Sequence, residues 1–167
     1  MKTAVVFYTR DGNTRLAANL LAKRLGADVF ELEEVKKRGR SAASFMAAGF
    51  GASFGFKSRL KSDYAQEMKA YDTICIGSPV WAGKTVPAVN AFVNTLEASG
   101  KKIILFTVQA DPHPEERPPV SLEAYKATLE NKGGLVAKML RMHGAPPGKT
   151  VDEADLQTQI SHGMTEF

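Results

Sequence analysis

The sequence of 167 residues predicts an α/β fold, in which helices cover both faces of a parallel sheet. Five short apolar runs alternate with segments whose apolar residues recur at helical spacing. The runs are largely continuous in apolar character, which is typical of strands that are buried on both faces. Parallel strands need crossover connections, and helical patterns separate most of the runs. The length suits one domain, so we expect residues 1–167 to form a single domain.

The first three strands are predicted over residues 4–8, 27–32 and 72–77. Each is short and contains β-branched or aromatic residues, which favour strands. An amphipathic helix is predicted between the first two strands, and Gly26 marks its end. The apolar face of this helix consists of Leu16, Ala17, Leu20, Leu21 and Leu25.

The second half of the chain continues the alternation. Strands are predicted over residues 101–108 and 135–142, the first of them central and the second at an edge of the sheet. Helices are predicted over residues 87–96, 121–131 and 152–160 by their apolar spacing and by the glycines near their ends.

The positive charge of the chain is concentrated in one stretch. The net charge is +4, but residues 35–62 hold seven basic residues and no acidic ones, which leaves −3 for the rest. The single cysteine, Cys75, lies in an apolar run, so we expect no disulfides and a cytoplasmic location. Three widely spaced histidines give no metal-ligand pattern, and we expect no metal site, membrane span or nucleic-acid partner.

A tight polar turn at residues 9–14 joins the first strand to the first helix. Its sequence, Thr-Arg-Asp-Gly-Asn-Thr, brings hydroxyls and backbone N–H groups to a helix N-terminus, which attracts anions. No lysine precedes Thr14, as a nucleotide P-loop would require, so a single terminal phosphate is the expected ligand. Two alternatives are a hairpin at Asp11 and Gly12, which the helical flank disfavours, and an ordinary turn capped by Thr14.

Two further segments follow predicted central strands. In such sheets, ligands bind beyond the carboxyl ends of the strands at a topological switch point. Residues 78–84, the tryptophan loop, contain the only tryptophan of the chain, Trp81. A tryptophan in a loop rich in glycine and proline predicts a stacking surface for a flat ligand; the alternative is an aromatic side chain that folds onto the core. Residues 109–119, the third loop, follow the fourth strand.

These loops resemble those of the flavodoxin-like family. Residues 9–14, hereafter the phosphate loop, look like its FMN phosphate loop, Thr/Ser-x-Thr-Gly-x-Thr. Residues 77–83, Gly-Ser-Pro-Val-Trp-Ala-Gly, are similar to the loop that flanks the isoalloxazine ring. The order of strands and helices agrees over nearly the whole chain. The resemblance implies a flavodoxin-like doubly wound sandwich, a five-stranded parallel sheet in the order 2-1-3-4-5, and FMN as the cofactor.

The resemblance also implies a role for each matching position. The Thr9 and Thr14 hydroxyls and the N–H groups of residues 10–14 would hold the phosphate, and Trp81 would pack on the flavin ring. Gly83 would permit a turn of the backbone that tunes the flavin potential in this family. The expected cofactor-binding residues are Thr9, Arg10, Asp11, Gly12, Asn13, Thr14, Ser78, Pro79, Val80, Trp81, Ala82, Gly83 and Gln109.

Two features depart from the family pattern. Asp11 replaces a hydroxyl residue and puts a carboxylate beside the expected phosphate. Either Arg10 or Arg15 compensates for its charge, or the side chain points away and caps the helix. The run also resembles the phosphate loop of flavodoxin-type protoporphyrinogen oxidases, which implies that an aspartate is compatible with FMN. The third loop lacks the Gly-Gly of the family, and its His113 is expected to be a surface residue.

A basic insertion rich in glycine and phenylalanine is predicted at about residues 36–62. Its residues 42–56 are uncharged and lie between basic clusters. Three interpretations are open. The insertion could form a helical cover on the sheet or flavin pocket, an interface with another protein or with a second copy of this chain, or a peripheral contact with an anionic membrane. A basic patch near the flavin would suit a partner with an acidic docking face or an anionic small substrate.

Three functions are compatible with these residues. The first is an FMN protein that carries electrons between redox partners, each either a protein or a small electron acceptor. The second is an FMN-dependent oxidoreductase that uses NAD(P)H and a quinone-type acceptor. The third is a non-redox relative that keeps the fold and either binds another phosphate compound or acts as an interaction module through its basic insertion. No catalytic acid, base or nucleophile and no nicotinamide site is evident, so the electron carrier is favoured.

Overall fold

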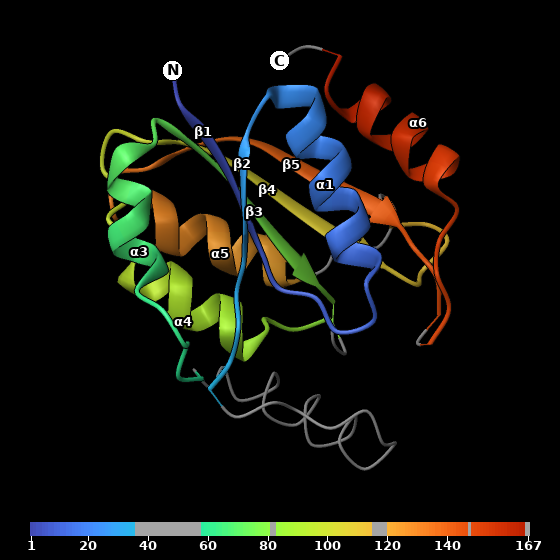
Figure 1. Ribbon diagram of the computed structural model, residues 1–167, viewed down its shortest axis with the longest axis horizontal. Helices are drawn as coiled ribbons and strands as arrows, with labels where there is room; N and C mark the ends of the chain where they lie inside the picture. The colour runs from blue at the N-terminus through green and yellow to red at the C-terminus, as the bar shows by residue number, and fades with distance from the viewer. Residues whose placement is uncertain (36–57, 81–82, 115–119, 147, 166–167) are drawn as a thin grey trace.

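A computed structural model describes residues 1–35, 58–80, 83–114, 120–146 and 148–165. A five-stranded sheet in the order β2-β1-β3-β4-β5 runs through its centre, and every neighbouring pair is parallel (Figure 1). This confirms the predicted α/β class and strand order. The strands are β1 Thr3–Phe7, β2 Asp28–Glu31, β3 Thr73–Pro79, β4 Lys102–Gln109 and β5 Leu135–His143.

Helices cover both faces of the sheet, as predicted (Figure 1). α1, Asn13–Leu25, and α6, Glu153–Gly163, lie on one face, and α4, Pro87–Thr95, and α5, Val120–Glu130, lie on the other. Alternate residues of the strands point to opposite faces, so each face has its own apolar core. The α1/α6 core contains Phe7, Leu21, Cys75, Phe106 and Leu156; the α4/α5 core contains Ile74, Val89, Phe92, Leu105 and Leu129.

One short helix was missed in the sequence. α3, Tyr64–Glu67, is followed by a 3-10 turn over Met68–Ala70, and the buried Tyr64 and Met68 join the α4/α5 core. The helix has only four residues, too few for a helical period to be recognised. Its one local signal is Asp63, whose Oδ1 accepts the N–H of Gln66 at 3.1 Å and caps the helix.

The side chain of Lys132, which is not part of α4, caps the C-terminus of that helix. Its ammonium group donates to the carbonyl oxygens of Val93 at 3.0 Å, Asn94 at 2.6 Å and Leu96 at 3.0 Å. These carbonyls lie at the end of α4, where they have no partner within the helix and where the helix dipole favours a cation. The segment between α5 and β5, which carries Lys132, therefore stabilises the C-terminus of α4.

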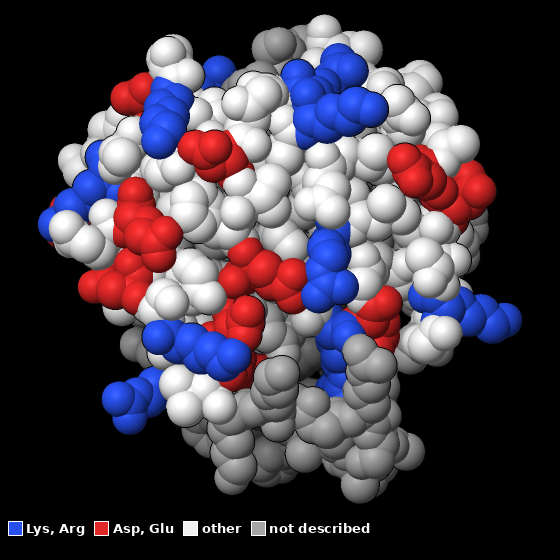
Figure 2. Space-filling view, in the orientation of Figure 1, with Lys and Arg blue, Asp and Glu red and all other residues white. Residues whose placement is uncertain are grey.

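Charges of both signs are interspersed over the face shown in Figure 2. Ion pairs of Lys2 with Asp28 at 3.4 Å and of Arg15 with Glu31 at 2.7 Å lie along β2. Most of the basic insertion, residues 36–57, lies outside the described residues. The three interpretations of the insertion therefore stay predictions. None of the helices in the described part of the chain is long and apolar enough to span a membrane.

Candidate functional site

The loops after β1 and β3 meet at the switch point of the sheet. β1 and β3 are neighbours, with Phe7 opposite Gly77, and the chain continues from β1 toward one edge and from β3 toward the other. The backbone N–H of Tyr8 donates to the carbonyl of Gly77 at 3.1 Å, which holds the starts of both loops together. This is the position at which parallel α/β sheets bind ligands. The phosphate and tryptophan loops therefore occupy the expected place.

A backbone turn at Gly12 starts α1 and shapes the phosphate loop. Gly12 has φ of +96°, a conformation that favours glycine, and its carbonyl accepts the N–H of Leu16 at 3.0 Å. Leu16 thus makes the first helical hydrogen bond, and the N–H groups of residues 13–15 point out of the helix end. Such an end attracts an anion.

The Thr9 hydroxyl is oriented by this turn. Its Oγ1 accepts the N–H of Gly12 at 3.1 Å, which leaves the hydroxyl proton available for another acceptor. Thr14, in the first turn of α1, is only 2% exposed. The loop therefore combines the Thr9 hydroxyl, a nearly buried Thr14 and a helix N-terminus within six residues.

Asn13 braces the phosphate loop against the segment before α6. Its Nδ2 donates to the carbonyl of Lys149 and its Oδ1 accepts the N–H of Val151, both at 2.9 Å. Both polar atoms of the side chain are used in this way, which leaves the backbone N–H and the second Nδ2 proton of Asn13 as donors for a phosphate.

The capping roles expected for Thr14 and Asp11 are wrong, and so is the alternative of a hairpin at Asp11 and Gly12, because α1 begins directly after Gly12. The N-cap of α1 is Gly12, and no side chain caps the helix, so neither Asp11 nor Thr14 has that role. The reason is the turn itself, which puts a glycine at the N-cap, exposes Asp11 and places Thr14 inside the helix.

The two arginines near Asp11 have different surroundings. Arg15 forms a bidentate pair with Glu31, with Nε–Oε2 at 2.8 Å and Nη2–Oε1 at 2.7 Å. The hydrogen bonds with Glu31 raise the pKa of the Arg15 guanidinium. The positive charge of Arg15 is therefore paired with the carboxylate of Glu31 in β2. Arg10 is half-buried, and its Nε and Nη1 atoms are shielded from solvent. Compensation of Asp11 by Arg10 stays a prediction.

The described part of the tryptophan loop is held close to the sheet. Ser78 is 1% exposed and its Oγ donates to the carbonyl of Pro79 at 2.8 Å; Pro79 and Val80 are half-buried. Gly83 has φ of +71° with open space where a Cβ would lie. Trp81 and Ala82 lie outside the described residues, so their predicted roles stay predictions.

A close approach of β4 explains the glycine at the start of this loop. A Cβ on Gly77 would lie 2.2 Å from the ring of Phe106, much closer than any real contact. The ring of Phe106 therefore fills the space beside β3, directly under the two loops. The requirement for glycine at this position is one of packing.

The third loop contributes a buried acceptor. Gln109, the last residue of β4, is 8% exposed, and its Oε1 has no hydrogen-bond partner among the residues that the structure describes. Such an atom suits a donor on a bound ligand. His113 is exposed, as expected, and its N–H donates to Asp111 Oδ1 at 2.9 Å.

The ends of the basic insertion are fastened beside the same loops. The N–H of Val35 donates to the Arg59 carbonyl and the N–H of Lys61 to the Glu33 carbonyl, both at 2.9 Å. Glu34, between them, accepts from the Tyr8 hydroxyl at 2.8 Å, directly before the phosphate loop. The insertion therefore leaves and re-enters the fold next to the switch point. These contacts could not be predicted from a local pattern, because they join residues that are far apart in the sequence.

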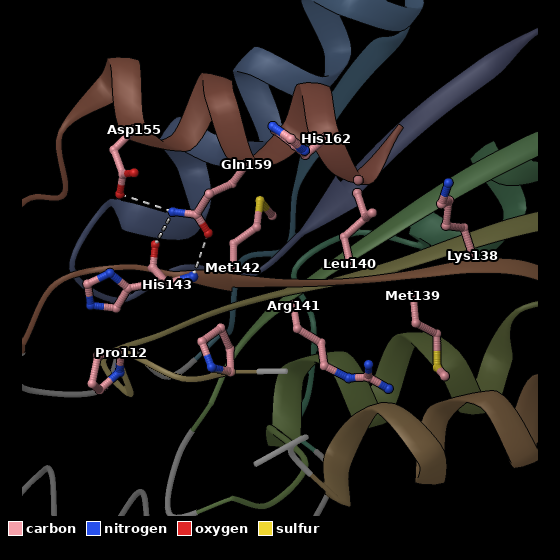
Figure 3. Close-up of a pocket in the computed structure, with 12 residues that line it drawn as sticks. Pro112, Lys138, Met139, Leu140, Arg141, Met142, His143, Asp155, Gln159 and His162 are labelled. Carbon is pink, nitrogen blue, oxygen red and sulfur yellow. Dashed lines mark hydrogen bonds between the residues drawn. The ribbon is translucent and has the colours of Figure 1, made fainter. Parts of the chain in front are cut away.

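A groove of about 560 Å³ lies elsewhere, outside β5 and beside α6 (Figure 3). The carboxamide of Gln159 accepts the N–H of His143 at 2.8 Å, and donates to the His143 carbonyl at 3.1 Å and to Asp155 Oδ2 at 3.0 Å. Gln159 thus occupies the outward backbone groups at the end of β5. Since β4 separates β5 from the switch point, this groove is not the predicted FMN site.

The described residues show no site for a metal ion. In the ranges that the structure describes, no three His, Cys, Asp or Glu side chains gather as metal ligands. The groups that converge at the switch point are hydroxyls, backbone N–H groups and an amide. This set fits the phosphate and the polar ring edge of FMN.

Comparisons with known proteins agree with this geometry. A family model described as flavodoxin matches residues 2–116. No curated protein sequence gives a significant match. Solved structures with the same fold include a presumed flavoprotein from Bacteroides uniformis, with 22% identity, TM-score 0.73, and coverage of 96% of this chain and 97% of that chain.

Two further structures are similar. Oxidised flavodoxin 2 from Bacillus cereus has 20% identity and a TM-score of 0.61, with 98% of this chain and 96% of that chain covered. A flavoprotein in complex with FMN from Lactobacillus acidophilus has 18% identity and a TM-score of 0.66, with 84% of this chain and 92% of that chain covered. At these identities the likeness shows a shared fold.

Proposed function

The chain belongs to the flavodoxin family, and we propose that it binds FMN at the switch point and carries electrons between redox partners. One observation supports this most directly. The phosphate loop and the tryptophan loop are separated by 63 residues, 15–77, in the sequence. They nevertheless start side by side, where the N–H of Tyr8 donates to the carbonyl of Gly77 at 3.1 Å. A phosphate group and a flat ring of the same ligand can therefore be held together.

The chain's own residues divide the binding between them. The Thr9 hydroxyl and the N–H groups of residues 13–15 hold the phosphate, because the hydroxyl proton is not used by the turn and the N–H groups lie at the N-terminus of α1. Gln109 offers its buried Oε1 to a donor on the ring edge. Trp81 packs on the ring, as the sequence predicts. Bound FMN supplies the one- and two-electron redox chemistry.

The redox partner is proposed from charge. The excess of basic residues lies in the stretch 35–62, whose ends are fastened next to the switch point by Tyr8 and Glu34. We propose that the partner is a protein with an acidic docking face or a small anionic electron acceptor. Increasing salt should slow its association, because exposed charges are screened.

An absorbance spectrum of the purified protein tests the proposed cofactor. Bound flavin gives a yellow protein whose flavin is released on denaturation, in about one equivalent per chain. A colourless protein that takes up no FMN when it is supplied would contradict the proposal and favour a non-redox phosphate ligand.

Rapid mixing of the FMN-loaded protein with NADPH tests the carrier role. A carrier should be reduced only slowly without a reductase, because no nicotinamide site is evident in the sequence. Immediate bleaching of the flavin without a partner enzyme would instead support the oxidoreductase that uses NAD(P)H and a quinone-type acceptor.

A further inference from the structure

The first residue of α1 is hydrogen-bonded to a segment far along the chain. The Nδ2 of Asn13 donates to the carbonyl of Lys149, and its Oδ1 accepts the N–H of Val151, both at 2.9 Å. The carboxamide thus pairs with two backbone groups, much as a neighbouring peptide group would. This pairing needs a donor and an acceptor on one short side chain, which asparagine supplies.

The residues that Asn13 holds lead directly into α6. Val151 is 8% exposed, and its side chain belongs to the α1/α6 core. Asp152 follows as the N-cap of α6, and its Oδ1 accepts the N–H of Asp155 at 3.0 Å. Because α1 follows β1 and α6 follows β5 in a parallel sheet, both helices begin at the same edge of the sheet (Figure 1). Asn13 therefore joins the N-termini of the two helices.

A local turn sets the path of this segment. The N–H of Lys149 donates to the carbonyl of Pro146 at 3.0 Å, and Gly148 has φ of +79°. Such a turn needs a residue that accepts a positive φ, which favours glycine. The turn brings residues 149–151 alongside α1, and Asn13 fastens them to the phosphate loop.

The first turn of α1 serves both this segment and the proposed phosphate. The N–H groups of residues 13–15 are the donors proposed for the phosphate, and the side chain of Asn13 holds residues 149 and 151. Helix ends fray, and ordering a frayed turn costs conformational entropy. Once either the phosphate or the segment has ordered the turn, the other binds at a smaller cost, so each stabilises the other.

We propose that Asn13 is a positioning residue that couples residues 149–151 to the phosphate site. Docking of the segment orders the first turn of α1 for the phosphate, and a bound phosphate holds the segment in place. The inference rests on the proposed FMN function, because it assigns a support to the same site. Asn13 has this role through the backbone of Lys149 and Val151.

Amide hydrogen exchange of the unmodified protein tests the coupling without any substitution. Saturating FMN should slow the exchange of the Val151 N–H at least about tenfold, a usual size for coupling between two sites. Saturating riboflavin, which lacks the phosphate, should slow it much less. The control is the N–H of Gln66, which a side chain also accepts, Asp63 Oδ1 at 3.1 Å, at the start of α3. Its exchange should not respond to FMN.

The variant Asn13→Ala removes both hydrogen bonds of the carboxamide. FMN should bind about tenfold more weakly, riboflavin should bind unchanged, and the Val151 N–H should lose its response to FMN. The matched control is Asn94→Ala, on α4 at the other face of the sheet. Asn94 is exposed and its Nδ2 donates to the Asn90 carbonyl at 2.7 Å. This variant should leave all three measurements unchanged.

The outcomes separate coupling from a direct contact. If Asn13→Ala weakens FMN binding, but FMN does not slow the exchange of Val151 in the unmodified protein, Asn13 only contacts the phosphate and the positioning role is overturned. Equal FMN affinity of Asn13→Ala and the unmodified protein would also overturn it. If Asn13→Ala does not fold, the exchange of the unmodified protein decides.

Failure of the proposed function has a different result. If the unmodified protein binds no FMN, the proposed cofactor is wrong, and inorganic phosphate at constant ionic strength replaces FMN in the exchange measurement. Slower exchange of Val151 in phosphate would support the coupling to a phosphate ligand. Unchanged exchange would overturn it.

Discussion

Asp11 places a carboxylate in a loop whose other features favour an anion. The structure exposes Asp11 and starts α1 at Gly12, so the carboxylate faces water and does not form part of the helix end. Exposed charges interact weakly because water and salt screen them. The repulsion between Asp11 and a phosphate is therefore small enough to be outweighed by the donors of the loop.

Replacement of Asp11 tests this explanation. We expect Asp11→Asn to strengthen FMN binding by less than about tenfold, because an exposed charge pair contributes roughly 1 kcal/mol at most. The gain should disappear in high salt. Glu130→Gln, at an exposed position on α5, is the control with the same loss of charge. Binding weakened by Asp11→Asn would show that the carboxylate assists the site.

Thr9 carries the second prediction about a single residue. Its Oγ1 accepts the Gly12 N–H at 3.1 Å, and in the proposed function its proton is donated to the phosphate, so Thr9→Val removes both interactions at nearly constant volume. FMN affinity should fall about 10- to 100-fold, as expected for a hydrogen bond to a charged group. Thr9→Ser keeps the hydroxyl and should bind nearly as well as the unmodified protein. Equal affinities of all three would exclude a phosphate contact at Thr9.

Helices and strands were predictable where their pattern was long. The continuous apolar residues of β4 and the regular apolar face of α1 are properties of local sequence, so both elements lie within one or two residues of their expected ends. α3 was not predictable in this way, because four residues do not complete two helical turns. Its position depends on the burial of Tyr64 against the rest of the fold.

The same distinction between local patterns and long-range contacts applies to the candidate site. The backbone donors of the phosphate loop follow from a strand, a glycine and a helix in sequence. The brace between Asn13 and Lys149 joins residues 136 positions apart, and the bond of Tyr125 to Val86 joins residues 39 positions apart. No local pattern records such contacts, since they exist only after the sheet has brought its loops together.

The cap on α4 gives a prediction about the helix itself. Lys132→Met keeps the aliphatic stem and removes the ammonium group that three carbonyls accept. The free energy of unfolding should fall by about 1–3 kcal/mol, because hydrogen bonds to a charged group are lost near a helix C-terminus. Lys23→Met, at an exposed position of α1, is the control and should change it by less than about 0.5 kcal/mol. Equal losses in urea unfolding would show that the cap contributes nothing specific.

The stability of the whole molecule should depend on Cys75 at alkaline pH. Cys75 is fully buried between β1 and β4, and burial raises the pKa of its thiol from about 9 to about 12. The unfolded chain then loses this proton at lower pH than the folded protein. The stabilisation is complete below about pH 9 and is lost as the pH rises toward 12, by up to about 1.4 kcal/mol per pH unit.

Urea unfolding at several pH values measures this effect. The difference in unfolding free energy between the unmodified protein and Cys75→Ala should be constant below pH 8 and shrink or reverse between pH 9 and 11. All other ionisable side chains are present in both proteins, so their effect cancels in the difference. A difference that does not vary with pH would show that the thiol ionises equally in both states.

The arrangement of the molecule around its switch point leads to one central claim, that the phosphate loop and the tryptophan loop together select FMN. Titration of the ligand-free protein with FMN and with riboflavin, followed by flavin fluorescence, tests it most directly because the two ligands differ only in the phosphate. We predict one FMN per chain, bound at least about 100-fold more tightly than riboflavin, since several charged hydrogen bonds of about 1.5–3 kcal/mol each are made by the phosphate. Equal affinity for both ligands, or no binding of either, would contradict the claim.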